Sequence, residues 1–364
     1  MADVDAGITL WSTCSAKERN KAAPGTFAAS RPSHMPSASP GPKRLVRRLV
    51  STKQILSNWR CPIPITHMGQ ATISQAQIEV LRFGFDYYAD YLHGSPSPGY
   101  FWFRKRQKVL ALIARHFQAS LDHTSSWKFA DLGCGDGVDL FLIRRKILEL
   151  ITSQSAAAPA TDSLRFVGVD GNPNLLRVCE LKKRYYQADD TELVNCNLAA
   201  RLPFDDDHFD FLYCSEVVEH LLEPDKFFAE VNRILKPGGH FLMTTPNEPN
   251  ILLRSYWSRK RREAIKAQAL RDRIEVIDPA GERLLIYGHV SLRKVTEWDS
   301  ALSKRGFKRI DAARGALFYS AAGVTNNEWV LALQMCLEGT LDRLPVLWTR
   351  SLSDQLIGLY RKVC

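Results

Sequence analysis

Short apolar runs alternate with longer segments of helical periodicity through the middle of this chain. Five of the runs predict strands, at residues 128–132, 164–169, 192–196, 209–214 and 240–245. The longer segments predict helices at 138–151, 173–183 and 224–235, with a small Ala- and Ser-rich insertion at 152–163. This alternation predicts an α/β fold with a parallel sheet, right-handed crossovers and a ligand site at the carboxyl edge of the strands.

Similar patterns continue on both sides of this core. Before it, residues 73–117 show helical periodicity with a break at 94–98, and 107–117 predicts an amphipathic helix leading into the first strand. The sequence Lys236-Pro-Gly-Gly predicts a helix stop before the fifth strand. After the core we expect a basic helix, a serine-capped helix, a strand, an apolar helix and a last strand, at 251–273, 288–306, 308–313, 329–341 and 355–363.

A glycine-rich turn follows the first strand, in the sequence Trp127-Lys-Phe-Ala-Asp-Leu-Gly-Cys-Gly-Asp-Gly137. Gly133, Gly135 and Gly137 lack Cβ atoms, so a ligand can approach the backbone, as in nucleotide-binding α/β folds. The spacing is GxGxG rather than GxGxxG, which disfavours NAD, and the Gly-Lys-Ser/Thr of a phosphate-binding loop is missing. The second strand ends at Asp170, where a carboxylate can accept hydrogen bonds from a ribose diol.

Composition indicates a globular protein with a basic amino-terminal tail. The 364 residues are 45% hydrophobic, and no apolar run approaches the roughly 20 residues of a membrane span. Residues 1–66 contribute +7 of the net charge of +10, with ten Lys/Arg against three acids. Residues 1–41 are expected to be disordered, with a transit peptide as the alternative. Residues 43–59 predict a helix that could touch an acidic surface.

The cysteines carry no sign of a metal site. All eight are scattered without CxxC pairs or metal-ligand spacing, at Cys14, Cys61, Cys134, Cys179, Cys196, Cys214, Cys336 and Cys364. This distribution predicts reduced thiols, a cytoplasmic location and no dedicated zinc site.

Further motifs follow the glycine turn in order. They are Leu164-Arg-Phe-Val-Gly-Val-Asp170, Leu202-Pro-Phe-Asp-Asp-Asp-His-Phe-Asp210, Phe211-Leu-Tyr-Cys-Ser-Glu-Val-Val-Glu-His220 and Leu235-Lys-Pro-Gly-Gly-His-Phe-Leu-Met-Thr-Thr-Pro-Asn247. Over residues 129–247 the series closely resembles class I S-adenosylmethionine-dependent methyltransferases, especially the ubiquinone-biosynthesis-type O-methyltransferases with a methyltransferase type 11 domain. The resemblance implies a Rossmann-like, doubly wound seven-stranded sheet with one antiparallel strand, a helical amino-terminal lid and a helical insert after strand five.

The resemblance also implies how the donor S-adenosylmethionine is held, with no metal ion. The implied donor-binding residues are Asp131, Gly133, Cys134, Gly135, Gly137, Asp170, Gly171, Asn172, Asn197, Leu198, Ser215 and Glu216. Asn197 stands where the family usually has Asp, and an amide can still donate or accept a hydrogen bond there. A lid over the donor is expected from the aromatic segment before the core, with packing in the core as the alternative. Its candidates are Tyr87, Tyr88, Tyr91 and residues 100–104.

The chemistry of this donor requires few catalytic groups. The methyl group is already activated on a sulfonium, so the protein mainly aligns the acceptor and excludes water. Methylation of a hydroxyl also needs a base near neutral pH, which favours histidine. The two candidates are His220 and His289, each with a structural role as the alternative. From the resemblance to O-methyltransferases we expect O-methylation of a small-molecule, lipid-linked or sugar-linked acceptor.

Two other functions stay open at this point. An RNA or protein methyltransferase would dock its substrate on the basic segments, of which 251–273 could also attract a phospholipid surface or be a merely solvated helix face. A non-catalytic scaffold is disfavoured, because it has no need for an open donor edge. The expected organisation is a tail at 1–41, a helical lid segment at 42–126 and a methyltransferase domain at 127–364, with an insert at 250–287.

Overall fold

The computed structural model describes residues 97–117, 126–154, 164–246, 259–277, 281, 283–315, 328–341 and 355–363. The expected tail at 1–41, the helix at 43–59 and the lid candidates Tyr87, Tyr88 and Tyr91 lie outside these residues. Within the described ranges, no helix combines the length and the apolar character needed to cross a bilayer.

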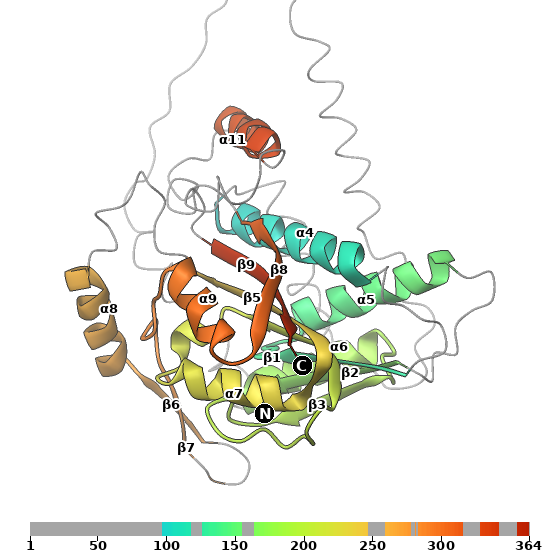
Figure 1. The fold of residues 1–364 in the computed structure, drawn as a ribbon, viewed down its shortest axis with the longest axis horizontal. Coiled ribbons are helices and arrows are strands. Elements are labelled where there is room, and N and C mark those ends of the chain that lie inside the picture. The colour runs from blue at the N-terminus through green and yellow to red at the C-terminus, as the bar shows by residue number, and fades with distance from the viewer. Residues whose placement is uncertain are drawn as a thin grey trace, which may run out of the picture. The chain divides into compact units, whose positions relative to one another are not determined.

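Seven strands form one sheet in the order β3-β2-β1-β4-β5-β9-β8 (Figure 1). They are β1 Trp127–Leu132, β2 Leu164–Asp170, β3 Thr191–Asn195, β4 Phe209–Ser215, β5 Leu235–Pro246, β8 Phe307–Arg314 and β9 Gln355–Lys362. The first five pair in parallel, and β9 is antiparallel to both β5 and β8. The predicted doubly wound sheet is therefore confirmed. Strand order reverses between β1 and β4, where the carboxyl ends of an open sheet form a binding crevice.

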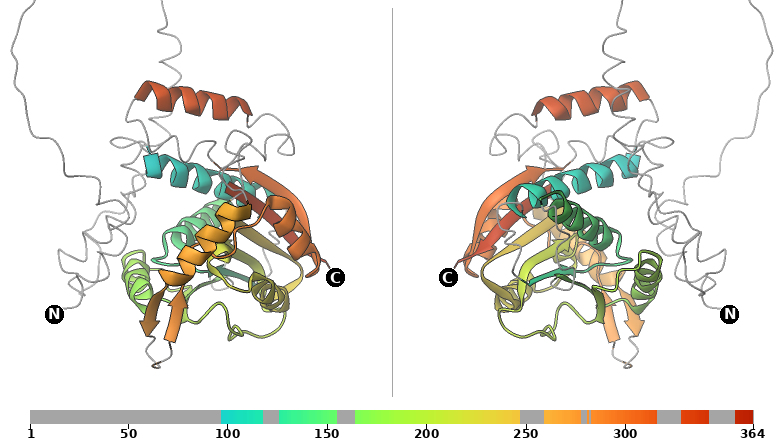
Figure 2. Two further views of the ribbon diagram at one scale, coloured as in Figure 1. Left: turned by 90° about the vertical axis from the view of Figure 1, so that its left-hand side faces the viewer. Right: turned by 90° about the vertical axis from the view of Figure 1, so that its right-hand side faces the viewer.

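Helices pack on both faces of this sheet (Figures 1 and 2). The described helices are α4 Ser97–Phe117, α5 Val138–Gln154, α6 Pro173–Tyr185, α7 Pro224–Ile234, α8 Arg259–Arg271, α9 Val295–Ser303 and α11 Glu328–Leu341, with a short 3₁₀ helix, η4, at Val218–His220. Along β4, Phe211 and Tyr213 pack toward α4 and α5, while Leu212 and Cys214 pack toward α7 and α9. This alternation follows from the two-residue repeat of a strand and buries it on both faces.

α7 ends at Ile234, directly before the predicted helix stop at Lys236-Pro-Gly-Gly, but β5 already begins at Leu235 rather than at residue 240. Phe209 of β4 pairs with Leu235, whereas Phe211 pairs with His240, so the register shifts between the two pairs. Gly238 has a φ of +76° within this irregular stretch. The glycines therefore form a bulge inside the strand rather than a turn before it.

Several predicted helix boundaries also move. α5 continues to Gln154, into the expected insertion, and α4 already begins at Ser97, inside the expected break. α9 is not serine-capped: its N-cap residue is Lys294, whose backbone N–H donates to the Glu297 carboxylate at 2.7 Å. The expected cap, Ser291, donates its hydroxyl to the Leu221 carbonyl at 2.5 Å. Tertiary hydrogen bonds thus override the local capping preference.

The insert after β5 is not wholly helical. α8 is followed by a two-stranded antiparallel sheet of β6, Ile274–Ile277, and β7, Arg283–Ile286. In Figure 1, α8 and this hairpin lie on the same flank of the molecule. The hairpin was missed because strands of four residues provide too little periodicity to be separated from a helical pattern.

Candidate functional site

The glycine turn is held by backbone hydrogen bonds to the end of β2. The N–H groups of Gly133 and Cys134 both donate to the Val169 carbonyl, at 2.7 and 3.0 Å. Gly133, Gly135 and Gly137 have φ angles of +89°, +55° and +84°, which a residue with a Cβ enters only at a cost. The turn conformation therefore depends on glycine at all three positions.

The three glycines differ in what surrounds them. A Cβ on Gly133 would lie 2.3 Å from Cγ2 of Val217, and one on Gly137 would lie 2.4 Å from Sγ of Cys179. A Cβ on Gly135 would meet only Leu175, at 3.9 Å. The first and third glycines are thus needed for close packing of the chain, whereas space remains above the middle one. The thiol of Cys134 is buried, so this residue offers the site only its backbone.

Asp170 organises the turn as well as facing the crevice. Its Oδ2 accepts a hydrogen bond from the Gly135 N–H at 2.8 Å, and its Oδ1 accepts one from the Asn172 N–H at 2.7 Å. Burial raises the pKa of Asp170, and these two N–H donors oppose the rise. Each carboxylate oxygen keeps a second lone pair, so the group can still accept hydrogen bonds from a ligand.

Asp131 is a buried acid without a protein partner. It is the second-to-last residue of β1, is 1% exposed, and neither carboxylate oxygen has a hydrogen-bond partner. Burial raises the pKa of Asp131 well above its usual value, and the nearby acids Asp139 and Asp170 add to the rise. An unpaired buried carboxyl group is costly, which is typical of a site where a ligand supplies the missing partner.

The residues expected near adenine lie at the ends of β2 and β3. Asn197 is exposed and its Oδ1 accepts a hydrogen bond from the Ala199 N–H at 2.9 Å, while Leu198 is buried beside the turn. A Cβ on Gly171 would lie 2.5 Å from Cδ2 of Leu284, which belongs to β7. The insert therefore reaches the same end of the sheet edge as Asp170.

A lysine that the sequence did not indicate lies at the centre of the edge. Lys105 of α4 is 1% exposed, and its Nζ donates to Oγ of Ser215 at 2.6 Å. Burial lowers the pKa of Lys105, and the carboxylates of Asp139 and Glu216 oppose this effect. The lid prediction ended at Arg104, one residue earlier, because no motif marks a lone lysine in a basic helix.

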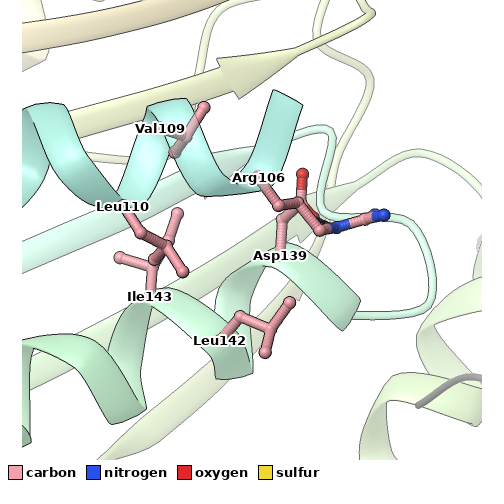
Figure 3. Close-up of a pocket in the computed structure, with 6 residues that line it drawn as sticks. All are labelled: Arg106, Val109, Leu110, Asp139, Leu142 and Ile143. Atoms are coloured by element: carbon pink, nitrogen blue, oxygen red, sulfur yellow. Dashed lines mark hydrogen bonds and ion pairs between the residues drawn. The ribbon is translucent and has the colours of Figure 1, made fainter. Parts of the chain in front are cut away.

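Asp139 anchors α4 above the start of α5. Its carboxylate pairs with Arg106 and accepts a hydrogen bond from the Tyr213 hydroxyl at 2.9 Å. Burial alone would raise the pKa of Asp139, but the cations Arg106 and Lys105 lower it to about 2. Figure 3 shows the apolar part of the contact, a small pocket between α4 and α5. It is lined by Arg106, Val109, Leu110, Asp139, Leu142 and Ile143.

Ser215 and Glu216, which follow β4, are joined by a chain of hydrogen bonds. Ser215 accepts from Lys105 and is 2.9 Å from Oγ1 of Thr244, which donates to Oε1 of Glu216 at 2.9 Å. Gln355 donates to the same Glu216 oxygen at 2.7 Å. Glu216 has a φ of +54°, a strained conformation for a residue with a side chain and one that often occurs at functional sites.

The two candidate bases lie together, although the insert separates them in the sequence. The ring centroids of His220 and His289 are 5.0 Å apart. Nδ1 of His220 lies 2.8 Å from the carbonyl oxygen of Tyr287, so this nitrogen carries the proton and donates it. Burial, with a contribution from His220, lowers the pKa of His289 to about 4, so its imidazole is neutral at pH 7.

Glu219 is the third member of this group. It is fully buried, its Oε2 accepts a hydrogen bond from Oγ1 of Thr245 at 2.9 Å, and its Oε1 has no hydrogen-bond partner. Burial raises the pKa of Glu219 well above its usual value, and Glu216 adds to the rise. The N–H groups of Val290 and Ser291 both donate to the Glu219 carbonyl at 2.9 Å, which ties the segment after the insert to η4.

Comparisons with known proteins agree with this architecture. Residues 130–243 match the family model described as a methyltransferase domain. A protein of Mycolicibacterium smegmatis named "Probable S-adenosylmethionine-dependent methyltransferase" is 31% identical over 147 residues, which cover 40% of this chain and 46% of that protein. The demethylmenaquinone methyltransferase of Clavibacter sepedonicus is 34% identical over 110 residues, which cover 30% of this chain and 44% of that protein. The matches thus span less than half the length of these curated relatives.

Among solved structures, an S-adenosylmethionine-dependent methyltransferase from Mesorhizobium loti aligns with 69% of this chain and 99% of its own, at 19% identity and a TM-score of 0.38. The assignment rests on the matched family and on the two sequence relatives, together with the strand order described above. This chain carries a methyltransferase domain of the class I S-adenosylmethionine-dependent family.

Proposed function

We propose that the protein transfers a methyl group from S-adenosylmethionine to a hydroxyl group of a small-molecule, lipid-linked or sugar-linked acceptor. The observation that carries the proposal is Asp131, whose two buried oxygens lack partners. They suit the ammonium group of the donor's methionine portion, since charge-assisted hydrogen bonds are the strong ones. The remaining lone pairs of Asp170 suit the ribose hydroxyls, and Gly135 leaves room for the ligand beside the backbone.

The protein's own residues would orient the acceptor and keep water out. When bound, S-adenosylmethionine supplies a methyl group already activated on a sulfonium. Lys105 brings α4 across the carboxyl end of β4 through its contact with Ser215. The continuing hydrogen bonds to Thr244 and Glu216 hold the side chains between the donor and acceptor ends in one arrangement. Such fixed positioning is the main catalytic contribution that this kind of transfer needs.

The histidine pair favours a hydroxyl acceptor. Because Nδ1 of His220 donates to the Tyr287 carbonyl, its Nε2 carries a lone pair, and His289 is neutral at pH 7. A hydroxyl group must lose its proton during methylation, and imidazole lone pairs can serve this step either directly or by holding a Lewis acid. Methylation of an acceptor atom that carries no proton would not need them.

Calorimetry on the full chain tests the donor assignment. S-adenosylhomocysteine, the demethylated product, is expected to bind one-to-one. Asp170→Ala should weaken this binding by about 30-fold or more, since two hydrogen bonds to a charged group are lost. Asp170→Asn should retain part of the affinity, and Asp189→Ala, at an exposed acid before β3, should leave it unchanged. Absence of binding to folded wild-type protein would refute the donor assignment, and full affinity in Asp170→Ala would refute the ribose contact.

A second test identifies the acceptor class. Transfer of a labelled methyl group should be measured with phenolic, sugar-linked and lipid-linked hydroxyl compounds. Methylation only of amines or of carbon atoms would refute the hydroxyl proposal while leaving the donor assignment intact.

RNA or protein is the second candidate acceptor, and the basic insert supports it. Lys266, Arg271 and Arg273 are exposed on or just after α8, and Ala269 of the same helix packs against Gly288 beside the histidine pair. Docking of RNA there would weaken steeply between about 50 and about 200 mM salt. Fluorescence anisotropy with labelled RNA tests this, because Lys266→Glu should weaken binding only if the helix is the docking surface.

A further inference from the structure

We propose that Glu219, His220 and His289 form a binding site for a first-row divalent cation, with Zn²⁺ as the first choice. One nitrogen or oxygen atom from each side chain lies within 4.8 Å of the other two. The amino-acid sequence predicted no metal site, because the cysteines lack ligand spacing and the family resemblance implied none. Glu219 and His220 are neighbours in the sequence, and His289 joins them only through the fold.

Glu219 has one carboxylate oxygen free to bind a cation and the other held in place by the protein. Its Oε1 is buried without a hydrogen-bond partner, and Thr245 holds the other oxygen at 2.9 Å. A buried oxygen that the protein leaves unsatisfied requires a partner from outside. The hydroxyl of Thr245 fixes the direction of the carboxylate, as outer partners do for the ligands of metal sites.

His220 shows the corresponding arrangement for an imidazole ligand. Its Nδ1 donates to the backbone carbonyl of Tyr287, which fixes the ring and leaves the Nε2 lone pair available, as is usual for metal-binding histidines. That Nε2 lies 3.8 Å from Oε1 of Glu219, too far for a hydrogen bond between them. The two atoms thus lie close enough together for one cation to bind both.

The distances between the three ligand atoms suit a divalent cation after a small movement of one side chain. Ligand atoms about 2.1 Å from a tetrahedral Zn²⁺ lie about 3.4 Å apart. The separation between Glu219 and His220 is already close to this value, and His289 has to approach by up to about 1.4 Å, within the reach of a side-chain rotation. Two imidazoles and one carboxylate favour Zn²⁺ and similar ions over Mg²⁺ or Ca²⁺, which prefer oxygen ligands.

Three protein ligands leave a coordination position open, as in catalytic zinc sites. The role of that position rests on the proposed function. An acceptor hydroxyl bound there would release its proton to water more readily. Its oxygen would then bond to the methyl carbon as the carbon–sulfur bond breaks, and the electron pair of that bond would stay on sulfur. The cluster would thus activate the acceptor through the cation rather than by direct proton abstraction.

Metal binding can be measured without the donor. Full-length protein treated with EDTA and dialysed should bind one equivalent of Co²⁺, detected by visible d–d absorption, and one of Zn²⁺, detected by calorimetry. Glu219→Gln and His289→Gln should each weaken both by tenfold or more, whereas His240→Gln, at a half-buried histidine on β5, should not. Absence of stoichiometric binding to folded wild-type protein, or equal affinity in all variants, would overturn the inference.

The same variants separate this inference from the proposed function. S-adenosylhomocysteine should bind Glu219→Gln and His289→Gln as it binds the wild type, because Asp131 and Asp170 are intact. Binding of Co²⁺ without binding of S-adenosylhomocysteine would support the cation site and refute the proposed donor. Binding of S-adenosylhomocysteine without Co²⁺ would support the donor and refute the cation site.

Discussion

The carboxyl edge has a donor end around Gly133 and Asp170 and an acceptor end around Glu219 and His289, named for the ligands that we propose for them. The two ends are built in different ways. At the donor end, backbone N–H groups of the turn from Gly133 to Gly137 donate to the Val169 carbonyl and to the Asp170 carboxylate. At the acceptor end, side chains from η4 meet His289, which follows the insert. A site made from backbone imposes strict residue types at close spacing, whereas a site made from side chains allows its members to lie anywhere in the chain.

The two ends also share a feature, since each holds a buried acid that the protein does not fully pair. Asp131 lacks partners for both oxygens, and Glu219 lacks one for Oε1 only. A buried, unpaired carboxyl group destabilises the free protein, so both acids point to ligands. The ends meet where Gly133 packs against Val217, two residues before Glu219.

The largest effect is expected from Gly133→Ala, which adds a Cβ atom at the contact between Gly133 and Val217. The added Cβ would lie 2.3 Å from Cγ2 of Val217 at a φ of +89°, so the free energy of unfolding should fall by about 2 to 4 kcal/mol. Binding of S-adenosylhomocysteine should be lost. Urea denaturation and calorimetry measure both quantities.

A second substitution divides this effect into its two causes. Val217→Ala in the Gly133→Ala background removes the steric clash and leaves the backbone strain, so about half of the lost stability should return. Complete recovery would show that the left-handed conformation of Gly133 carries no cost.

Removing the lysine between the two ends should have the next largest effect. Lys105→Met deletes the hydrogen bond to Ser215 and one of the cations beside Asp139, which should cost on the order of 2 kcal/mol of stability. Lys226→Met, which breaks an exposed pair with Glu223, should cost less than about 0.5 kcal/mol. Thermal melts of both variants, compared with wild type, test whether α4 is held through Lys105.

The difference in stability between the wild type and Asp131→Asn should depend on pH. Because the pKa of Asp131 is raised in the folded state, its contribution to stability is present below the ordinary value of about 3.9 and is lost as pH rises through the folded-state pKa. Asp131→Asn should therefore match the wild type near pH 4 and exceed it by about 1 to 2 kcal/mol at pH 8. It should also weaken S-adenosylhomocysteine binding. Denaturation over this pH range measures the difference, and a constant offset would contradict the assignment.

The smallest effect is expected where the insert touches the donor end. Leu284→Ala removes the side chain that packs on Gly171, and S-adenosylhomocysteine affinity should fall by about two- to fivefold. The neighbouring Leu285 is 39% exposed and points to the other face of β7, so Leu285→Ala serves as the control and should leave affinity unchanged. Equal effects of both variants would indicate a general loss of hairpin stability.

The features that could be predicted from the sequence are those whose residues lie within a few positions of one another. The glycine turn and Asp170 could be recognised because each residue type answers a backbone requirement within a few positions. Lys105 was missed because its role depends on where α4 crosses β4. The hairpin of β6 and β7 was missed because its strands are short, and the Lys-Pro-Gly-Gly motif of β5 was misread because a bulge and a turn use the same residues.

The amino-acid sequence by itself determined the α/β architecture, the parallel core and the place of the crevice, since hydrophobic periodicity and strand–helix alternation leave few alternatives. It also determined the conformation of the glycine turn. Only the tertiary structure decided that Asp131 lacks partners, that Lys105 reaches Ser215, and that Glu219, His220 and His289 form one cluster. These properties depend on burial and on distances between segments remote in the chain, which no local pattern encodes.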